Sequence, residues 1–210
     1  MRRLVVIALL LSLLPATNTQ AAANDALSAL NKLEVKGRAA KTGYTRSQFP
    51  HWSDPDRNGC DARNDTLKRD LTDITYKPGT RDCKVIGGQL LDPFSGKVII
   101  FSPTKVVIDI DHVVALSNAW QTGAAYFDKT KRSQIANDPL NLLAVDAKLN
   151  RQKGDADAAT WLPPAKSYRC EYVARQIAVK IKYSLWLTAP EKSAMSKILA
   201  SCKVQLLPIN

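Results

Sequence analysis

The amino-acid sequence predicts an α+β fold in one small mixed domain. Two patterns support this class. Strand-like runs flank the turn segment "DPFSG" in mid-chain, and a long amphipathic stretch, "YRCEYVARQIAVKIKYSLWL", indicates a helix near the end. A length of 210 residues with 45% apolar residues fits a single domain with a substantial core. We therefore expect residues 24–210 to form one domain with a β-hairpin and C-terminal helices.

The chain begins with the pattern of a signal peptide over residues 1–23. Arg2 and Arg3 supply a charged start, "LVVIALLLSLL" is the apolar stretch, and an A-x-A cleavage pattern ends at Ala23. The apolar stretch is too short for a membrane anchor, and no other stretch approaches spanning length. We expect a secreted or periplasmic protein without a membrane anchor.

The first half of the mature chain starts with a short helix and linker over residues 24 to about 41. Leucines at helical spacing behind a capping residue then predict a helix over Asn64–Ile74. The runs "CKVIGGQLL" and "KVIIF", on either side of "DPFSG", predict a β-hairpin.

The second half alternates strands and helices. "TKVVIDI" predicts a third strand, and a mostly helical pattern covers residues 117–137. "NLLAV" predicts another strand, after which Asp146 can cap a helix through "AKLNRQKGD".

Two terminal helices complete the domain. The amphipathic stretch noted above places Val173, Ile177 and Ile181 on one face of the first. Thr188 and Glu191 have capping-box spacing, which predicts the start of a last helix that runs toward Cys202.

The exported part of the chain contains four cysteines, Cys60, Cys83, Cys170 and Cys202. An even count in an exported protein favours disulfides, although four cysteines permit three pairings. We expect Cys60–Cys83 and Cys170–Cys202, because each pair closes a local loop within one half of the chain. A zinc site is the competing interpretation, but no C-x-x-C pair or neighbouring histidine supports it.

The chain is basic, with a formal net charge of +11 that includes Arg2 and Arg3. Such a charge suits a polyanionic partner such as nucleic acid, because phosphate contacts and counterion release supply much of the affinity. A merely solubilising surface is about equally common among basic exported proteins. Charge alone does not decide the function.

A strand ending in Asp-His, a connection, a second strand and a helix with an asparagine together resemble the ββα-metal core of the HNH, or His-Me finger, endonucleases. The stretches "DIDHVVAL", "NDPLNLLAVD" and "LNRQKGD" carry this match, which places the core at about residues 105–155. The HNH nuclease domain of the RNA-guided CRISPR effectors is similar in its Asp-His pair and its later asparagines, here Asn141 and Asn150. From "GYTRSQFPHW" to "WLPPAKSYRCEY", the wider chain resembles a family of small exported bacterial HNH nucleases.

The resemblance implies roles for individual residues. Phosphodiester hydrolysis needs an activated water and a cation that neutralises charge on the phosphoryl and leaving groups. His112, with a reference pKa of roughly 6.5, is the expected general base. Asp111 and Asn150 carry hard oxygens that suit Mg²⁺, with Mn²⁺ as the alternative ion. Asn141 completes the catalytic group by pinning the connection and helping to orient the imidazole.

Asp109 shares a strand face with Asp111. It is either an indirect or water-mediated partner of the metal, or a residue that caps a turn or balances charge, and both interpretations stay open. Basic residues in the family-like segments are candidate phosphate contacts, although most basic residues in such a chain are only solvated. These candidates are Arg46, Arg63, Lys153 and Arg169.

We therefore expect a secreted, metal-dependent, HNH-type endonuclease that acts as a monomer on nucleic acid. The resemblance implies 5′-phosphate and 3′-hydroxyl ends. We favour DNA over RNA, with little sequence specificity, although the sequence itself does not separate the two nucleic acids. Two other functions stay open: a nuclease toxin or effector, and a basic nucleic-acid-binding protein without catalysis. The intact Asp-His pair and asparagines argue against the second, and a toxin would need a delivery module or an immunity partner.

Overall fold

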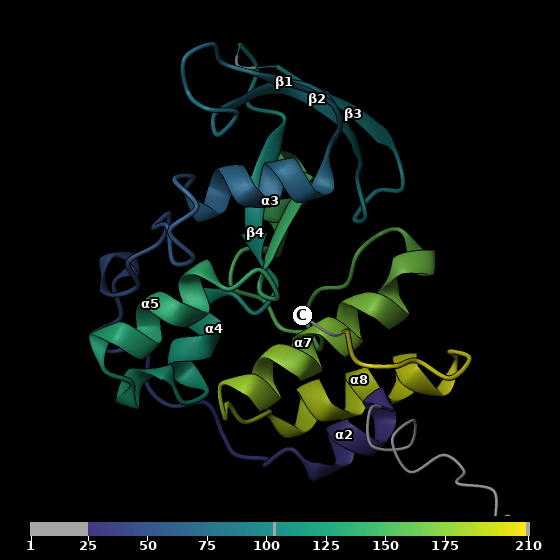
Figure 1. The fold of residues 1–210 in the computed structure, drawn as a ribbon. Helices are drawn as coiled ribbons and strands as arrows, with labels where there is room; N and C mark the ends of the chain where they lie inside the picture. The colour runs from purple at the N-terminus through teal and green to yellow at the C-terminus, as the bar shows by residue number, and fades with distance from the viewer. Residues whose placement is uncertain (1–24, 103, 209–210) are drawn as a thin grey trace, which may run out of the picture.

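The structure, a computed structural model, describes residues 25–102 and 104–208 (Figure 1). The signal peptide expected at residues 1–23 lies outside this part. Helices and antiparallel sheets alternate, which confirms the α+β class, and no helix in the described part is long and apolar enough to cross a membrane. In chain order the elements are α2 (Ala26–Lys32), η1 (Arg46–Gln48), α3 (Ala62–Asp70), β1 (Thr72–Tyr76), β2 (Val85–Leu91), β3 (Val98–Phe101), β4 (Ile108–His112), α4 (Leu116–Gln121), η2 (Ala124–Tyr126), α5 (Lys129–Asn137), β5 (Leu142–Asp146), α6 (Ala147–Lys153), η3 (Lys166–Tyr168), α7 (Arg169–Lys182) and α8 (Ala189–Ala200).

The first sheet has three antiparallel strands in the order β1-β2-β3. β2 and β3 form the predicted hairpin, with Leu91 opposite Val98 next to the turn. Within the turn, the carboxylate of Asp92 accepts a hydrogen bond from the backbone N–H of Ser95 at 2.8 Å. Gly96 takes a left-handed φ of 73°, which a glycine adopts without strain. Local turn chemistry therefore fixes this hairpin.

The second sheet pairs β4 with β5 in antiparallel register, from Ile108 opposite Asp146 to His112 opposite Leu142. α6 follows β5 directly, because Asp146 ends the strand and also caps the helix by accepting from the N–H of Leu149 at 2.8 Å. α6 then packs against both strands. In Figure 1, β4 lies between the three-stranded sheet and the layer of helices α2, α7 and α8, so its end is held in the middle of the molecule.

One predicted helix is shorter than expected. The leucine spacing predicted a helix over Asn64–Ile74, whereas α3 ends at Asp70 and the following residues form β1. Leu71 leaves the helix with extended backbone angles. The β-branched residues Thr72 and Ile74 then favour a strand that pairs with β2. Helix and strand follow each other here without a turn signal between them.

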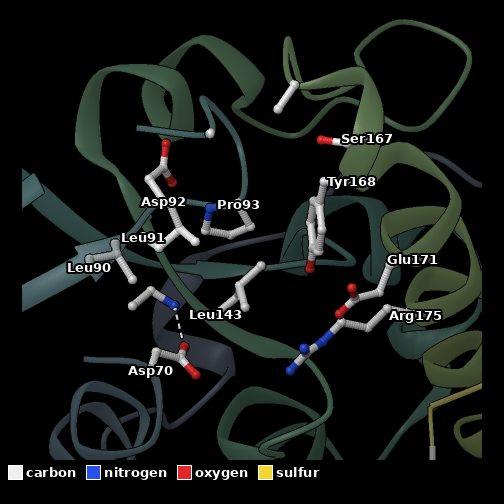
Figure 2. A pocket seen from close by; sticks show the side chains of 13 residues that line it. Asp70, Leu90, Leu91, Asp92, Pro93, Leu143, Ser167, Tyr168, Glu171 and Arg175 are labelled. Atoms are coloured by element: carbon white, nitrogen blue, oxygen red, sulfur yellow. Dashed lines mark hydrogen bonds between the residues drawn. The ribbon is translucent and has the colours of Figure 1, made fainter. Parts of the chain in front are cut away.

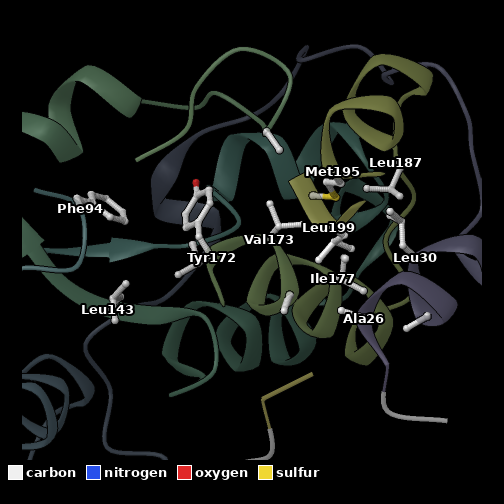
Figure 3. Close-up of a cluster of buried hydrophobic side chains, with 14 of the residues drawn as sticks. Ala26, Leu30, Phe94, Leu143, Tyr172, Val173, Ile177, Leu187, Met195 and Leu199 are labelled. Atoms are coloured by element: carbon white, nitrogen blue, oxygen red, sulfur yellow. The ribbon is translucent and has the colours of Figure 1, made fainter. Parts of the chain in front are cut away.

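A hydrophobic cluster joins the terminal helices to the second sheet (Figure 3). Val173 and Ile177 of α7 are buried in it, as predicted, against residues of α2 and α8. Ile181 was predicted on the same face but is 44% exposed, because it lies in the last turn of α7, next to the helix end at Lys182. α8 opens with the predicted capping box of Thr188 and Glu191.

All four cysteines form disulfides, in the two pairs expected from the sequence. Cys60–Cys83 ties the segment before α3 to the loop just before β2. Cys170–Cys202 ties the first turn of α7 to the chain just after α8. Each bridge therefore closes a loop within one half of the chain, and neither crosses the β4–β5–α6 unit.

Candidate active site

A cavity of about 260 Å³ opens where β4 ends beside α6. The last two residues of β4, Asp111 and His112, reach its wall, and Asn150 reaches it from the middle of α6. Because α6 packs against β4, side chains that are distant in the sequence meet here. The other lining residues are Tyr44, Arg46, Ile110, Ala115, Leu116, Ser117, Gly154 and Asp155.

The imidazole of His112 is held from two sides. Its Nε2 lies 2.9 Å from the backbone carbonyl oxygen of Ala136. Since a carbonyl only accepts, Nε2 carries the hydrogen, and in the neutral ring Nδ1 has the free lone pair. The indole of Trp52 stacks on the ring, with 5.9 Å between centroids and 29° between planes. His112 therefore presents a fixed proton acceptor.

The protein environment keeps His112 neutral. Burial lowers the pKa of His112 from 6.5 to about 3, although the hydrogen bond to Ala136 acts in the opposite direction. The positive charges of Arg46 and Lys153 lower this pKa further. The sequence alone predicted an ordinary histidine pKa of roughly 6.5 for His112, and the lowering of this pKa follows from its burial in the structure. At neutral pH the imidazole is therefore uncharged, and its Nδ1 lone pair carries no proton.

Asp111 forms a buried ion pair with Lys153. The Nζ of Lys153 lies 2.8 Å from Oδ1 of Asp111 and donates a second bond, also 2.8 Å, to the carbonyl of His112. Burial raises the pKa of Asp111, and the ammonium beside it opposes that rise. Oδ2 of Asp111 is buried without a hydrogen-bond partner in the described structure. Lys153 was predicted to contact phosphate; its enclosed ammonium corrects that prediction.

Asp109 supports the site through Asn150. The Nδ2 of Asn150 donates to Oδ2 of Asp109 at 3.3 Å, and Arg151 lies 3.7 Å from the same oxygen. Because a carboxylate only accepts, the amide nitrogen must face Asp109, which leaves the amide oxygen of Asn150 free. Asp109 itself is not part of the cavity wall. Asp109 therefore orients the Asn150 amide and lies close to the charge of Arg151.

Asn141 lies beneath the site. It is fully buried, and its Oδ1 accepts from the N–H of Val114 at 2.8 Å. Its Nδ2 donates to the carbonyls of Ile135 at 3.1 Å and Val114 at 3.3 Å. These bonds pin the connection between β4 and β5, but it is the carbonyl of Ala136 that orients His112. Asn141, which was grouped with the catalytic residues for this structural role, therefore pins the connection as expected but makes no hydrogen bond to the imidazole itself.

Arg46 is the basic candidate that lines the cavity with its side chain open to solvent. Arg63 lies in the first turn of α3, outside the cavity wall. Arg169 begins α7 and donates its Nε to the carbonyl of Pro163 at 2.8 Å. Of the four basic candidates, Arg46 is therefore the one that lines the cavity beside His112.

Two features of the site escaped sequence analysis. Trp52, which stacks on His112, has a left-handed φ of 62° that is unusual for a bulky residue. Asp155 accepts from Lys41 at 2.7 Å and from Ser117 at 2.9 Å, and these bonds lower its pKa. Both residues stand in stretches quoted for the family resemblance, "FPHW" and "KGD", but nothing local in the sequence shows these contacts.

A larger cavity, of about 560 Å³, lies between the β2–β3 hairpin, β5 and the first turns of α7 (Figure 2). Two of its charged groups are already engaged. Asp70 accepts from the N–H of Ala144 at 2.8 Å, and Arg175 donates to the carbonyl of Leu140 at 2.7 Å. The smaller cavity is the candidate active site because it joins an unpaired carboxylate oxygen to a neutral imidazole.

A fixed imidazole that can take a proton from water, beside a carboxylate and an arginine, suits hydrolysis of an anionic substrate. Fold and site together indicate a hydrolase built on a small α+β domain. The chain belongs to the family described as "GmrSD restriction endonucleases, C-terminal domain", whose model matches residues 61–198. The match includes β4, β5 and α6, and thus Asp111, His112 and Asn150. Membership in this nuclease family implies nucleic acid as the substrate.

One curated relative is an "Uncharacterized secreted protein" of Arthroderma benhamiae (strain ATCC MYA-4681 / CBS 112371). It is 37% identical over 182 residues, which cover 86% of each chain. The likeness therefore extends well beyond the site and over most of the chain. No solved structure matches.

Proposed function

We propose that this protein is a secreted, metal-dependent endonuclease of the HNH type, with Mg²⁺ as its ion and Mn²⁺ as a substitute. It hydrolyses phosphodiester bonds, acts on DNA in preference to RNA with little sequence specificity, and leaves 5′-phosphate and 3′-hydroxyl ends. The observation that carries this proposal is the neutral His112 beside an unpaired carboxylate oxygen of Asp111 in one cavity.

The residues of the cavity fit a hard divalent cation. Oδ2 of Asp111 is a buried oxygen without a partner, and the amide oxygen of Asn150 is free because Asp109 holds the amide nitrogen. The described residues contain no group of three or more acidic, histidine or cysteine side chains around a common point. A site with so few protein ligands suits Mg²⁺, which usually keeps several of its waters. Asp111 and Asn150 would hold the ion.

The chain's own residues account for the proton transfer and the substrate position. Nδ1 of His112 takes the proton from the attacking water, since Nε2 is committed to Ala136. Trp52 covers one face of the ring and limits its rotation. Arg46 contacts a phosphate at the cavity mouth. When bound, the ion supplies positive charge that stabilises the phosphoryl and leaving oxygens.

Three observations support secretion. The sequence starts with a signal-peptide pattern, both cysteine pairs are oxidised, and the relative from Arthroderma benhamiae is named as secreted. Disulfides persist in oxidising compartments and are rare in the cytosol. We expect the mature protein to act as a monomer outside the cytoplasm.

The direct test incubates the purified protein with plasmid DNA, or with RNA, in Mg²⁺ or in excess EDTA. Supercoiled plasmid should be nicked and then fragmented in Mg²⁺, faster than RNA is cut, and should stay intact in EDTA. End-labelling of the fragments should report a 5′-phosphate. Full cleavage in EDTA would contradict metal dependence, and an intact plasmid under all conditions would favour a silent nucleic-acid binder.

A further inference from the structure

We infer that Lys153 determines which divalent cation the site accepts, because it keeps one oxygen of Asp111 out of the ion's reach. This inference rests on the proposed metal dependence and deepens it. Lys153 lies behind Asp111 and does not line the cavity, so it is a positioning residue.

The ammonium of Lys153 is fixed by its surroundings. Its side chain has no solvent exposure, and its Nζ makes two bonds of 2.8 Å, to Oδ1 of Asp111 and to the carbonyl of His112. Gly154 follows with a φ of 54°, so the backbone turns out of α6 directly after Lys153. If the ammonium moved away, a carboxylate and a carbonyl would lose their shared partner inside the protein. Through these two hydrogen bonds, Lys153 holds the last turn of α6 against the end of β4.

Because of this ion pair, the two carboxylate oxygens of Asp111 have different surroundings. Oδ1 is engaged by Lys153, whereas Oδ2 is buried and unpaired in the described structure. Asp111 can thus offer a cation one oxygen and not two. Mg²⁺ prefers octahedral geometry with single oxygens, whereas Ca²⁺ takes roughly six to eight oxygens and often binds both atoms of a carboxylate. A one-oxygen Asp111 consequently favours Mg²⁺ and Mn²⁺ over Ca²⁺.

A simpler role for Lys153 would be charge balance alone. Removing its positive charge would then strengthen the binding of every divalent cation by about the same factor. The ratio of Ca²⁺ to Mg²⁺ affinity would stay constant. If Lys153 instead blocks Oδ1, its removal should also shift this ratio toward Ca²⁺. The ratio therefore separates the two roles.

The experiment follows Mn²⁺ binding to the metal-free protein through the electron paramagnetic resonance signal of the free ion, with Mg²⁺ or Ca²⁺ as the competitor. Asp111→Ala identifies the fraction of Mn²⁺ bound at this site. In the wild type, Mg²⁺ should displace that fraction better than Ca²⁺. In Lys153→Met the ratio should shift toward Ca²⁺ by roughly tenfold, about the worth of one charge-assisted contact.

Two matched variants control for charge and for general changes in α6. Lys148→Met removes the same charge from an exposed position of the same helix and should keep the wild-type ratio. Lys153→Arg keeps the charge and the donors and should also keep it. Circular dichroism confirms that each variant is folded before titration.

The outcomes separate this inference from the function on which it rests. Wild-type protein that shows no Mn²⁺ binding dependent on Asp111 would overturn the proposed metal site and the inference with it. Normal binding with an unchanged ratio in Lys153→Met would overturn the role of Lys153 alone. If Lys153→Met does not fold, the wild type still decides, because Ca²⁺ that displaces Mn²⁺ as well as Mg²⁺ does would contradict the inference.

Discussion

The protein contains two buried lysine–carboxylate pairs, and their surroundings differ. Lys180 of α7 lies 3.0 and 3.2 Å from the two carboxylate oxygens of Glu191 in α8 and also donates to the carbonyl of Trp186 at 3.0 Å. Lys153 of α6 bonds one oxygen of Asp111 and leaves the other without a partner beside a cavity. In both pairs the lysine side chain is fully buried.

The comparison shows that a buried ion pair does not by itself indicate a functional site. Lys180 lies 3.0 and 3.2 Å from the two carboxylate oxygens of Glu191 and joins two helices within the helical core, although Oε1 of Glu191 makes no hydrogen bond. Each pair therefore contains one buried carboxylate oxygen without a hydrogen bond, and such an oxygen needs a ligand or an explanation. The difference is that Asp111 lines a cavity, where a ligand can reach it, whereas Glu191 lies in the helical core. Three predictions test whether the two regions differ in this way.

The largest expected effect is on catalysis. His112→Ala should lower turnover on plasmid DNA by roughly 10² to 10⁴-fold, because a positioned base is lost, while the fold remains intact. Lys180→Met, in the core pair, should leave the rate per folded molecule largely unchanged. Initial rates at saturating substrate provide the measurement.

Extra Mg²⁺ sharpens this test. It should not rescue His112→Ala, whereas Asn150→Ala, which loses a candidate oxygen ligand, should recover part of its rate. Wild-type turnover in purified His112→Ala would show that His112 is not the general base. The cavity at Asp111 would then have no catalytic role that distinguishes it from the pair at Glu191.

The next effect is on stability. Breaking either pair leaves a buried carboxylate without its counter-ion, so Lys153→Met and Lys180→Met should each lower the free energy of unfolding by about 3–5 kcal/mol. Urea titrations in EDTA measure these losses. Added Mg²⁺ should restore part of the stability of Lys153→Met, because an ion bound to the folded state replaces the missing positive charge. Equal recovery in Lys180→Met would mean that the ion acts elsewhere.

A smaller effect comes from pH. The pKa of His112 is about 3 in the folded protein and 6.5 in the unfolded chain. Between these two pH values the imidazole is protonated in the unfolded chain and neutral in the folded protein. His112 therefore adds no penalty above pH 6.5, and stability falls as the pH drops from there toward 3. The loss should be roughly 3 kcal/mol at pH 4.

His112→Ala lacks this titration, so its unfolding free energy in EDTA should fall less than that of the wild type between pH 7 and pH 4. Lys148→Met, an exposed change, provides the control for general acid effects. Parallel pH profiles for wild type and His112→Ala would show that the imidazole is not buried in its neutral form.

Local chemistry made much of the fold predictable. The "DPFSG" hairpin, the Asp146 cap and the capping box of Thr188 and Glu191 depend on residues within a few positions of one another. The boundary between α3 and β1 was missed because no turn residue separates the two, and the strand forms only where β2 is present to pair with it.

The site was predictable only where residues share a short segment or a family-like spacing. Asp111, His112 and Asn150 lie around one cavity, as the spacing implied. The position of Lys153 was not predictable, because a lysine near the end of a short helix is normally solvated, and its burial depends on how α6 packs on β4. The stacking of Trp52 on His112 depends in the same way on tertiary packing between distant segments.

The ammonium of Lys153 also bears on the order in which this protein matures. The carboxylate of Asp111 already has a positive partner, so the chain can fold around it before any ion arrives. Small zinc domains behave differently, since their folding and metal binding are a single event. Under the proposed function the two events are separable here: a chelator should abolish activity without unfolding the protein, and protein that folded without the ion should become active once the ion is added, with no folding step left to complete.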